Sequence, residues 1–397
     1  MTSRFDDVID RSDTISIKWA KSQLQDLYGE PDLIALGIAD MDFRVSPAIA
    51  EAVQNRAAHE NYGYAYPSDE YLDACVNWQK RRNHWEIKRD WITYTPGLNV
   101  PLTAAVEIFT EPGDNVIIQS PVYYPYYHYV QEKGRNVAVN VLVNRDGYYE
   151  INFEDLEAKA KDPKTKAMIL CSPHNPVGRN WTKEELTRIG RICIDNGVKL
   201  AVDEIHSDLV FEPNVFVPFA TISDEFAQNA MICTSPSKSF NLAGLLNSDI
   251  IIPNDEIRAA FRQWMDPLYL WPGAFGAVSQ IAAYNDSEEW LEELKVYLKG
   301  NAEYVAKIIK DRNLKIKYAV PEATYLGWLD FRAYGMTNEE LWDFMIHEAH
   351  VATDDGPKFG FCGDADGFQR LNFACPRSRL IVAMERIADA LEKRFGK

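Results

Sequence analysis

The chain has 397 residues, 46% of them hydrophobic and 25% charged, a composition that is ordinary for a globular protein large enough for two domains. Its 59 acidic and 42 basic side chains give a net charge of −17, which repels phosphodiester backbones and anionic membrane surfaces and so argues against a nucleic-acid partner. No apolar run approaches the roughly 20 residues of a membrane span, so we expect no membrane association.

Six cysteines are scattered along the chain without a C-x-x-C pair, which favours free thiols in a reducing compartment and no metal site. The first residues, MTSRFDDVIDRSD, are polar and acidic and lack the apolar core of a signal peptide. Together these features predict a cytoplasmic protein.

Residues 1–45 are too irregular for one regular element and predict an arm that leads into a strand. Ser46-Pro47 predicts the start of a helix, with the serine as cap and proline at the first helical position. An aromatic turn at residues 62–67 and a helix near residues 68–83 follow.

From about residue 91 the chain alternates helical stretches with short apolar runs of strand length. The seven runs are 91–94, 116–118, 137–143, 167–170, 198–202, 230–234 and 249–252. Continuous rather than alternating hydrophobicity indicates strands that are covered on both faces. The pattern predicts an α/β fold with a mostly parallel seven-stranded sheet, whose ligands bind at the carboxyl ends of the strands.

Beyond about residue 285, amphipathic helices dominate. Ser287 and Thr337 are the expected caps of two of them, and residues 376–395 form the last. Short strands near 314–318, 325–331 and 368–374 lie between the helices and predict a second, smaller α+β domain.

Lys238 follows the apolar run 230–234 in the sequence Ser235-Pro236-Ser237-Lys238. A lysine amine forms a Schiff base with an aldehyde, and pyridoxal phosphate (PLP) is the common aldehyde cofactor that also needs hydroxyl donors for its phosphate. The stretch by itself is equally compatible with a solvent-facing lysine after a strand.

Other strand ends carry the remaining groups that such a cofactor needs. Asp203 could keep a pyridine nitrogen protonated, although it could also be a helix cap or an ion-pair partner. Asn175, between two prolines, could hydrogen-bond the phenolic oxygen of the ring, or simply form a turn. Tyr123 offers a flat face for stacking, or is one more core aromatic.

A phosphate site is expected at Gly97-Leu98-Asn99, between a strand and an apolar helix, because backbone N–H groups and the helix dipole favour anions there. An ordinary strand-to-helix loop is the alternative. Order and spacing strengthen the case, since 28 residues separate Asn175 from Asp203 and 35 separate Asp203 from Lys238.

Taken together, the run from Gly97 to Lys238 resembles the fold-type I PLP-dependent enzymes of the aminotransferase class I/II group. The resemblance covers nearly the whole chain. It implies a large cofactor domain, residues 46–284, and a small domain built from both chain ends, residues 1–45 and 285–397. It also implies a homodimer whose two subunits share each active site.

Finer motifs are similar to the MalY/PatB cystathionine β-lyase (C–S lyase) subfamily. These motifs are Lys18-Trp19, Asp40-Met41-Asp42-Phe43, residues 203–208 and residues 372–379. The common aminotransferase pattern has a tyrosine where His206 stands and an arginine where Leu246 stands, and the β-lyase branch shares both departures.

Because this arginine is missing, phosphate binding is expected to fall to Ser235, Ser237, the amides of residues 97–99 and Tyr64 from the partner subunit. The resemblance also implies that His206 lies beside the cofactor. Arg370 matches the family arginine that binds the substrate α-carboxylate, and Tyr64 is expected beside the substrate. A guanidinium suits this role because it grips a carboxylate with two parallel hydrogen bonds.

The resemblance implies a PLP-dependent C–S β-lyase that cleaves L-cystathionine or related S-substituted L-cysteines to a thiol, pyruvate and ammonia. Lys238, Asp203 and Tyr123 are the expected catalytic residues, with freed Lys238 as the base that takes the Cα proton. An aminotransferase shares every step up to the carbanion and stays open as an alternative. A cofactor-binding regulatory protein is the third, although such a protein would normally add a DNA-binding module.

Overall fold

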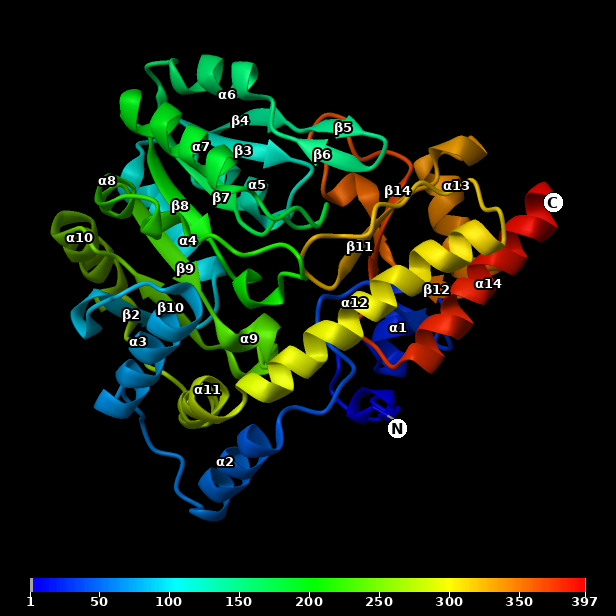
Figure 1. Ribbon diagram of the computed structural model, residues 1–397, viewed down its shortest axis with the longest axis horizontal. Coiled ribbons are helices and arrows are strands. Elements are labelled where there is room, and N and C mark those ends of the chain that lie inside the picture. The colour runs from blue at the N-terminus through cyan, green and yellow to red at the C-terminus, as the bar shows by residue number, and fades with distance from the viewer. Residues whose placement is uncertain (1–2, 397) are drawn as a thin grey trace.

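The computed structural model describes residues 3–396, and its larger part is built on one seven-stranded sheet (Figure 1). The strands lie in the order β2 (Ile92–Thr95), β10 (Ser248–Ile251), β9 (Ala230–Thr234), β8 (Lys199–Asp203), β7 (Thr165–Cys171), β3 (Asn115–Ser120) and β4 (Asn136–Val141). Strand β10 runs antiparallel to the other six strands, which all point the same way. The predicted α/β fold and its mostly parallel sheet are confirmed.

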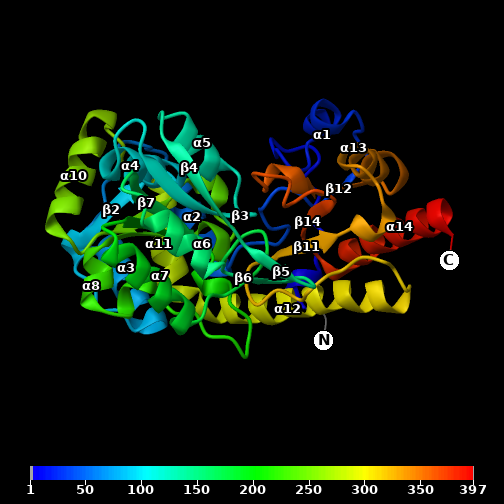
Figure 2. The ribbon, with the colours of Figure 1, turned by 90° about the horizontal axis from the view of Figure 1, so that it is seen from above.

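In most strands of this sheet alternate residues enter two separate hydrophobic clusters, which explains why the runs are apolar throughout. In β3, Val116 and Ile118 pack on one face and Ile117 on the other. The first face is covered by α4 (Asn99–Phe109), α5 (Pro125–Gln131) and α10 (Asp255–Met265), and the second by α6 (Phe153–Ala160), α7 (Lys183–Asp195) and α8 (Asp224–Gln228) (Figure 2).

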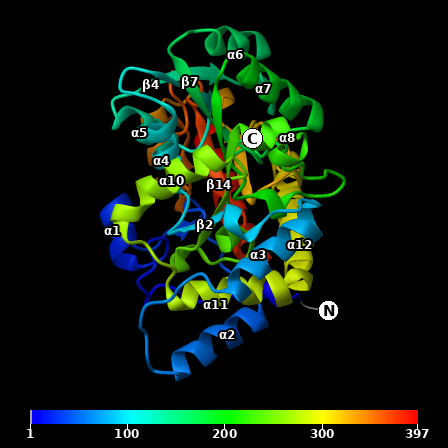
Figure 3. The same ribbon diagram turned by 90° about the vertical axis from the view of Figure 1, so that its left-hand side faces the viewer.

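Three further helices extend the second face. Helix α2 (Pro47–Ala58) lies outside α11 (Ala274–Asp286), which packs on α3 (Asp69–Asn83) (Figure 3). Helix α2 starts at the predicted residue, but neither Ser46 nor Ser287 caps its helix by a side-chain hydrogen bond. The two buried hydroxyls are 2.8 Å apart and Ser287 donates to Ser46, because the starts of α2 and α12 (Glu288–Asp311) meet there.

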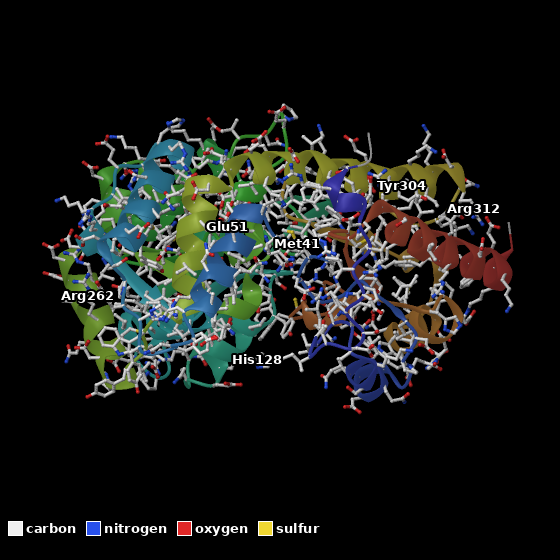
Figure 4. The ribbon with its side chains drawn as sticks, turned by 90° about the horizontal axis from the view of Figure 1, so that it is seen from below. Met41, Glu51, His128, Arg262, Tyr304 and Arg312 are labelled. Carbon is white, nitrogen blue, oxygen red and sulfur yellow. The ribbon has the colours of Figure 1, made fainter. Side chains whose placement is uncertain are left out.

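The smaller part contains both chain ends and is reached along α12 (Figure 1). Its antiparallel sheet has the order β11 (Leu326–Asp330), β14 (Phe368–Asn372), β13 (Asp354–Asp355), and it packs with α12, α13 (Asn338–Asp343) and α14 (Arg377–Phe395). From the N-terminal region come α1 (Lys21–Tyr28) and β1 (Ile34–Ala35), which pairs in parallel with β12 (Val351–Ala352). Buried Met41 lies between the two parts (Figure 4).

Two of the predicted strands differ from the structure. Residues 314–318 form no regular strand, since only Lys317 pairs with Asp330, and Tyr318 instead lies against Gly327. The run 137–143 divides between β4 and the separate hairpin of β5 (Val143–Arg145) and β6 (Tyr148–Glu150). The domain boundaries at residues 46 and 285 stay a prediction.

The short helix α9 (Pro236–Ser239) completes the larger part. No helix among residues 3–396 is long and apolar enough to cross a membrane. Helix α7 begins with a capping box, in which the Thr182 hydroxyl accepts from the Glu185 amide at 3.2 Å.

Packing of α7 against α8 is tight at Gly190, where an added Cβ would overlap the ring of buried Phe226. We expect Gly190→Ala to lower the free energy of unfolding, because overpacking costs about 1–3 kcal/mol and exceeds the gain in helix propensity. Urea denaturation followed by circular dichroism measures the change. Lys183→Ala, on the exposed side of the same helix, is the control, and equal midpoints for the two variants would contradict the prediction.

Candidate active site

Loops at the carboxyl ends of the parallel strands enclose a cavity of about 230 Å³. This is the edge at which ligands bind in such sheets. Nine of the residues singled out from the sequence line it: Gly97, Leu98, Asn99, Tyr123, Asn175, Asp203, His206, Ser237 and Lys238. Segments as far apart in the chain as β2 and α9 therefore meet around one space.

Lys238 lies on α9, directly after β9, and its amine donates a hydrogen bond of 2.7 Å to the Ala39 carbonyl. Burial, followed by the positive charge of Arg370, lowers the pKa of this amine from its usual range to about 8. Asp40 and Asp203 act in the opposite direction. Lys238 is thus held out of bulk water and is partly uncharged near neutral pH, as a nucleophile or base requires.

Asp203 ends β8 and is buried. Burial raises its pKa, whereas hydrogen bonds from the Tyr126 hydroxyl at 2.6 Å and the Ile205 amide at 3.0 Å lower it. Such a carboxylate can pair with a cationic ring nitrogen. Sequence reasoning missed Tyr126, although its position three residues after Tyr123 is a usable signal.

Next to Asp203, the Glu204 carboxyl is also buried, and burial raises its pKa to about 8. Burial, together with the charges of Lys238 and Arg370, lowers the pKa of His206 to about 3. The imidazole of His206 is therefore neutral, and its Nδ1 has no hydrogen-bond partner among the described residues. An unpaired buried polar atom beside the cavity suits a polar ligand.

Asn175 and Tyr123 line the cavity between the sheet edge and the smaller part. The side-chain oxygen of Asn175 accepts a hydrogen bond of 3.1 Å from Arg370. Burial raises the pKa of Tyr123 to about 12, so its hydroxyl stays protonated at neutral pH. Its ring meets Tyr126 edge to face, with centroids 5.7 Å apart.

Arg370 lies on β14 and is 3% exposed. It lines a second cavity of about 710 Å³, which shares Ala39, Tyr123, Lys238 and Ala243 with the first. Lys238 therefore stands between a smaller space bordered by the sheet and a larger one bordered by the N-terminal segment. The larger space can hold a substrate, and Lys238 lines both spaces.

An anion would meet the residues at the N-terminus of α4. Gly97 has a φ of +86°, which a glycine adopts without strain, and the helix begins at Asn99. Leu246 lines the cavity at the position of the family arginine, and Lys238 is the only lysine or arginine among the described residues that line it. Asn247 also lines the cavity and was missed, because nothing in its own segment marks it.

Two predicted residues lie elsewhere. Ser235 caps α9, accepting from the Ser237 amide at 3.1 Å and donating to the Asn247 carbonyl at 2.6 Å, and it is not among the residues that line the cavity. Tyr64 lies between α2 and α3 with its side chain fully exposed, and it lines neither cavity of its own chain. Their roles as cofactor ligands stay predictions.

Residues 31–387 match the family described as aminotransferase class I and II. The chain belongs to this family. It is 41% identical to the cystathionine beta-lyase PatB of Bacillus subtilis over 98% of its own length and 99% of that protein.

Solved structures agree with this placement. Cystalysin from Treponema denticola, which contains pyridoxal 5'-phosphate, superposes with a TM-score of 0.94 at 35% identity, covering 99% of this chain and all of that one. The PLP-bound C-S lyase from Staphylococcus hominis gives a TM-score of 0.90 at 30% identity over 98% of both chains. The fold is that of the fold-type I PLP-dependent enzymes.

Since Arg370 contributes to the lowered pKa of Lys238, we expect Arg370→Met to raise that pKa: removing a nearby positive charge makes the ammonium form less unfavourable. The pH dependence of acylation of Lys238 in cofactor-free protein, followed by mass spectrometry of its peptide, measures the shift. Arg332→Met, at an exposed arginine of the smaller part, is the control. A profile that stays in place or moves to lower pH in Arg370→Met would show that the charge of Arg370 does not act on the amine.

Proposed function

We propose that the protein is a PLP-dependent carbon–sulfur β-lyase that converts L-cystathionine or related S-substituted L-cysteines to a thiol, pyruvate and ammonia. The observation that carries the proposal is the full-length similarity to a cystathionine beta-lyase, combined with a half-buried lysine at the strand ends that lines the same cavity as a buried aspartate. Cystalysin and the Staphylococcus hominis lyase, whose structures hold PLP, support the cofactor assignment.

The residues around the cavity suit PLP in charge and chemistry. Lys238 supplies the amine, Asp203 a carboxylate for the ring nitrogen, and Tyr123 an aromatic face. The unpaired Nδ1 of His206 and the side chain of Asn175 are available to polar atoms of the ring. When bound, PLP supplies an electron sink that stabilises negative charge at Cα of an amino acid.

Phosphate binding falls to the amides of residues 97–99 and to the hydroxyl of Ser237. A helix N-terminus stabilises an anion through unpaired N–H groups and the helix dipole. Leu246 contributes no charge, so this site relies on hydrogen bonds more than on a guanidinium.

The chain's own residues account for the proton and the substrate. Arg370 binds the α-carboxylate, and this directs Cα towards the space beside Lys238. The Lys238 amine takes the Cα proton, the Cβ–S bond breaks, and the electron pair leaves with sulfur as thiolate. The remaining aminoacrylate is hydrolysed to pyruvate and ammonia. Hydrogen bonds from Tyr126 and Ile205 favour the ionised form of Asp203, in opposition to burial, which raises its pKa.

An aminotransferase is the second candidate, because the matching family is named for that activity and the residues for proton removal are common to both reactions. The outcomes differ in products. Elimination yields pyruvate and a thiol without a second substrate, whereas transamination consumes a 2-oxo acid.

We expect the purified protein to release pyruvate and free thiol in equal amounts from L-cystathionine, as measured with lactate dehydrogenase and a thiol reagent. Lys238→Ala should lower this rate by at least about 100-fold, the usual contribution of a general base. Glutamate formation that depends on 2-oxoglutarate, without pyruvate, would replace the lyase by the aminotransferase. Lys299→Ala, an exposed lysine of α12, is the matched control.

We further propose that the enzyme works as a homodimer in the cytoplasm. Exposed aromatic side chains lie on two connections of the larger part, one between α2 and α3 and one between α10 and α11: Tyr62, Tyr64, Tyr66, Tyr269 and Trp271. Exposed apolar surface of this kind favours a protein partner, and a second copy would bring Tyr64 to the neighbouring cavity. All six cysteines are unpaired, which favours a reducing compartment.

If Tyr64 acts in the partner's site, mixing two inactive variants restores activity. A dimer of one Lys238→Ala chain and one Tyr64→Ala chain contains one site with both residues intact. We expect a refolded equimolar mixture to recover about a quarter of the wild-type rate, since half of the chains pair this way and each pair has one intact site. A mixture no more active than its components would show that Tyr64 does not act across an interface.

A further inference from the structure

Arg370, the arginine assigned to the substrate carboxylate, already holds a carboxylate of its own chain. Asp354 faces it directly across the antiparallel pair of β13 and β14, and one oxygen of Asp354 forms an ion pair with Nη2 of Arg370. Both side chains are mostly buried, with 4% of Arg370 and 13% of Asp354 exposed. Asp354 and Arg370 both line the larger cavity.

The guanidinium is held by three further contacts. Nη1 donates to the side chain of Asn175 and Nη2 to the carbonyl of Gly37, each at 3.1 Å, and the group lies 4.6 Å from the ring centre of Phe359. Nε is buried and has no partner among the described residues. Arg370 therefore keeps its position without the negative charge of Asp354, and two of its five N–H groups, on Nε and Nη1, have no acceptor among the described residues.

A substrate carboxylate that approaches Arg370 meets this pair rather than a bare cation. It must share or displace the bond between Nη2 and Asp354, and it enters beside a second negative charge in a poorly solvated space. An unpaired buried guanidinium is costly, so Asp354 stabilises the site when no substrate is present and opposes binding when one arrives.

We propose that Asp354 is an internal competitor for the substrate α-carboxylate at Arg370 and sets the affinity of the site for amino acids. The proposal rests on the proposed function, in which Arg370 binds that carboxylate. Asp354 is a positioning residue, because it acts on the substrate through Arg370.

Removing the negative charge of Asp354 while keeping the shape of its side chain isolates the effect of that charge on substrate binding. In Asp354→Asn the side-chain oxygen still accepts from Nη2, but the guanidinium keeps its full positive charge. We expect the holoenzyme of this variant to bind L-alanine, which has no leaving group at Cβ, at least about threefold more tightly than wild type, the size of a modest ion-pair effect. Isothermal titration calorimetry measures the dissociation constant.

L-Alaninamide, which lacks the carboxylate, should bind both proteins equally. Asp354→Ser, which also removes the charge, should change affinity in the same direction, and Asp354→Glu should not tighten binding. If Asp354 only kept Arg370 in order, Asp354→Asn and Asp354→Ser would bind L-alanine more weakly. The predicted gain in affinity therefore separates competition for Arg370 from a purely structural role of Asp354.

The neighbouring Asp355 is the matched control. It lies on the same strand and accepts a hydrogen bond of 2.7 Å from Gln369 rather than from Arg370. Asp355→Asn removes one negative charge at nearly the same place and should leave the affinity for L-alanine unchanged.

The proposal is overturned if Asp354→Asn and Asp354→Ser both bind L-alanine no more tightly than wild type. It is also overturned if their affinity for L-alaninamide rises as much as that for L-alanine, or if Asp355→Asn gains the same affinity for L-alanine. Arg370→Met separates this result from the proposed function. If Arg370→Met loses affinity for L-alanine while Asp354→Asn gains none, the role of Asp354 alone is overturned. If Arg370→Met binds L-alanine like wild type, the carboxylate role of Arg370 fails as well.

Discussion

A lysine amine removed from water at the edge of a parallel sheet is the constraint around which the site is built. Burial disfavours the ammonium form of Lys238, and its surroundings either reinforce or relieve that effect. Arg370 reinforces it, while Asp40 and Asp203 favour the charged form. The balance leaves a pKa of about 8, in the range where an amine both accepts and returns a proton at neutral pH.

The N-terminal segment completes this environment through its backbone. The carbonyls of Gly37 and Ala39 accept from Arg370 and Lys238, and those of Ile38 and Asp40 accept from Asn372. Main-chain carbonyls have fixed positions once the segment is anchored, so they orient side chains from both parts of the molecule. A buried cluster of charges, which includes Lys18 and Asp42 at 3.3 Å, anchors the segment.

Residues that act within one strand-loop-helix unit were predictable, because apolar runs mark strands and a polar residue after a strand marks the ligand edge. Lys238, Asp203 and Asn175 fall in this class, and all three line the cavity. Asn247 and Asp354 escaped notice, since each is defined by a neighbour in another segment. The serines expected to cap α2 and α12 pair with each other instead for the same reason.

By itself the sequence determined the seven strands, their burial on both faces, the edge at which a ligand binds and the lysine at its centre, because all of these follow from local patterns of polarity. Tertiary structure alone decided which charges surround that lysine. Arg370 reaches the carbonyl of Gly37 across 333 residues and meets Asp354 through the register of two strands. Such contacts depend on how distant segments pack, and no single segment records that information.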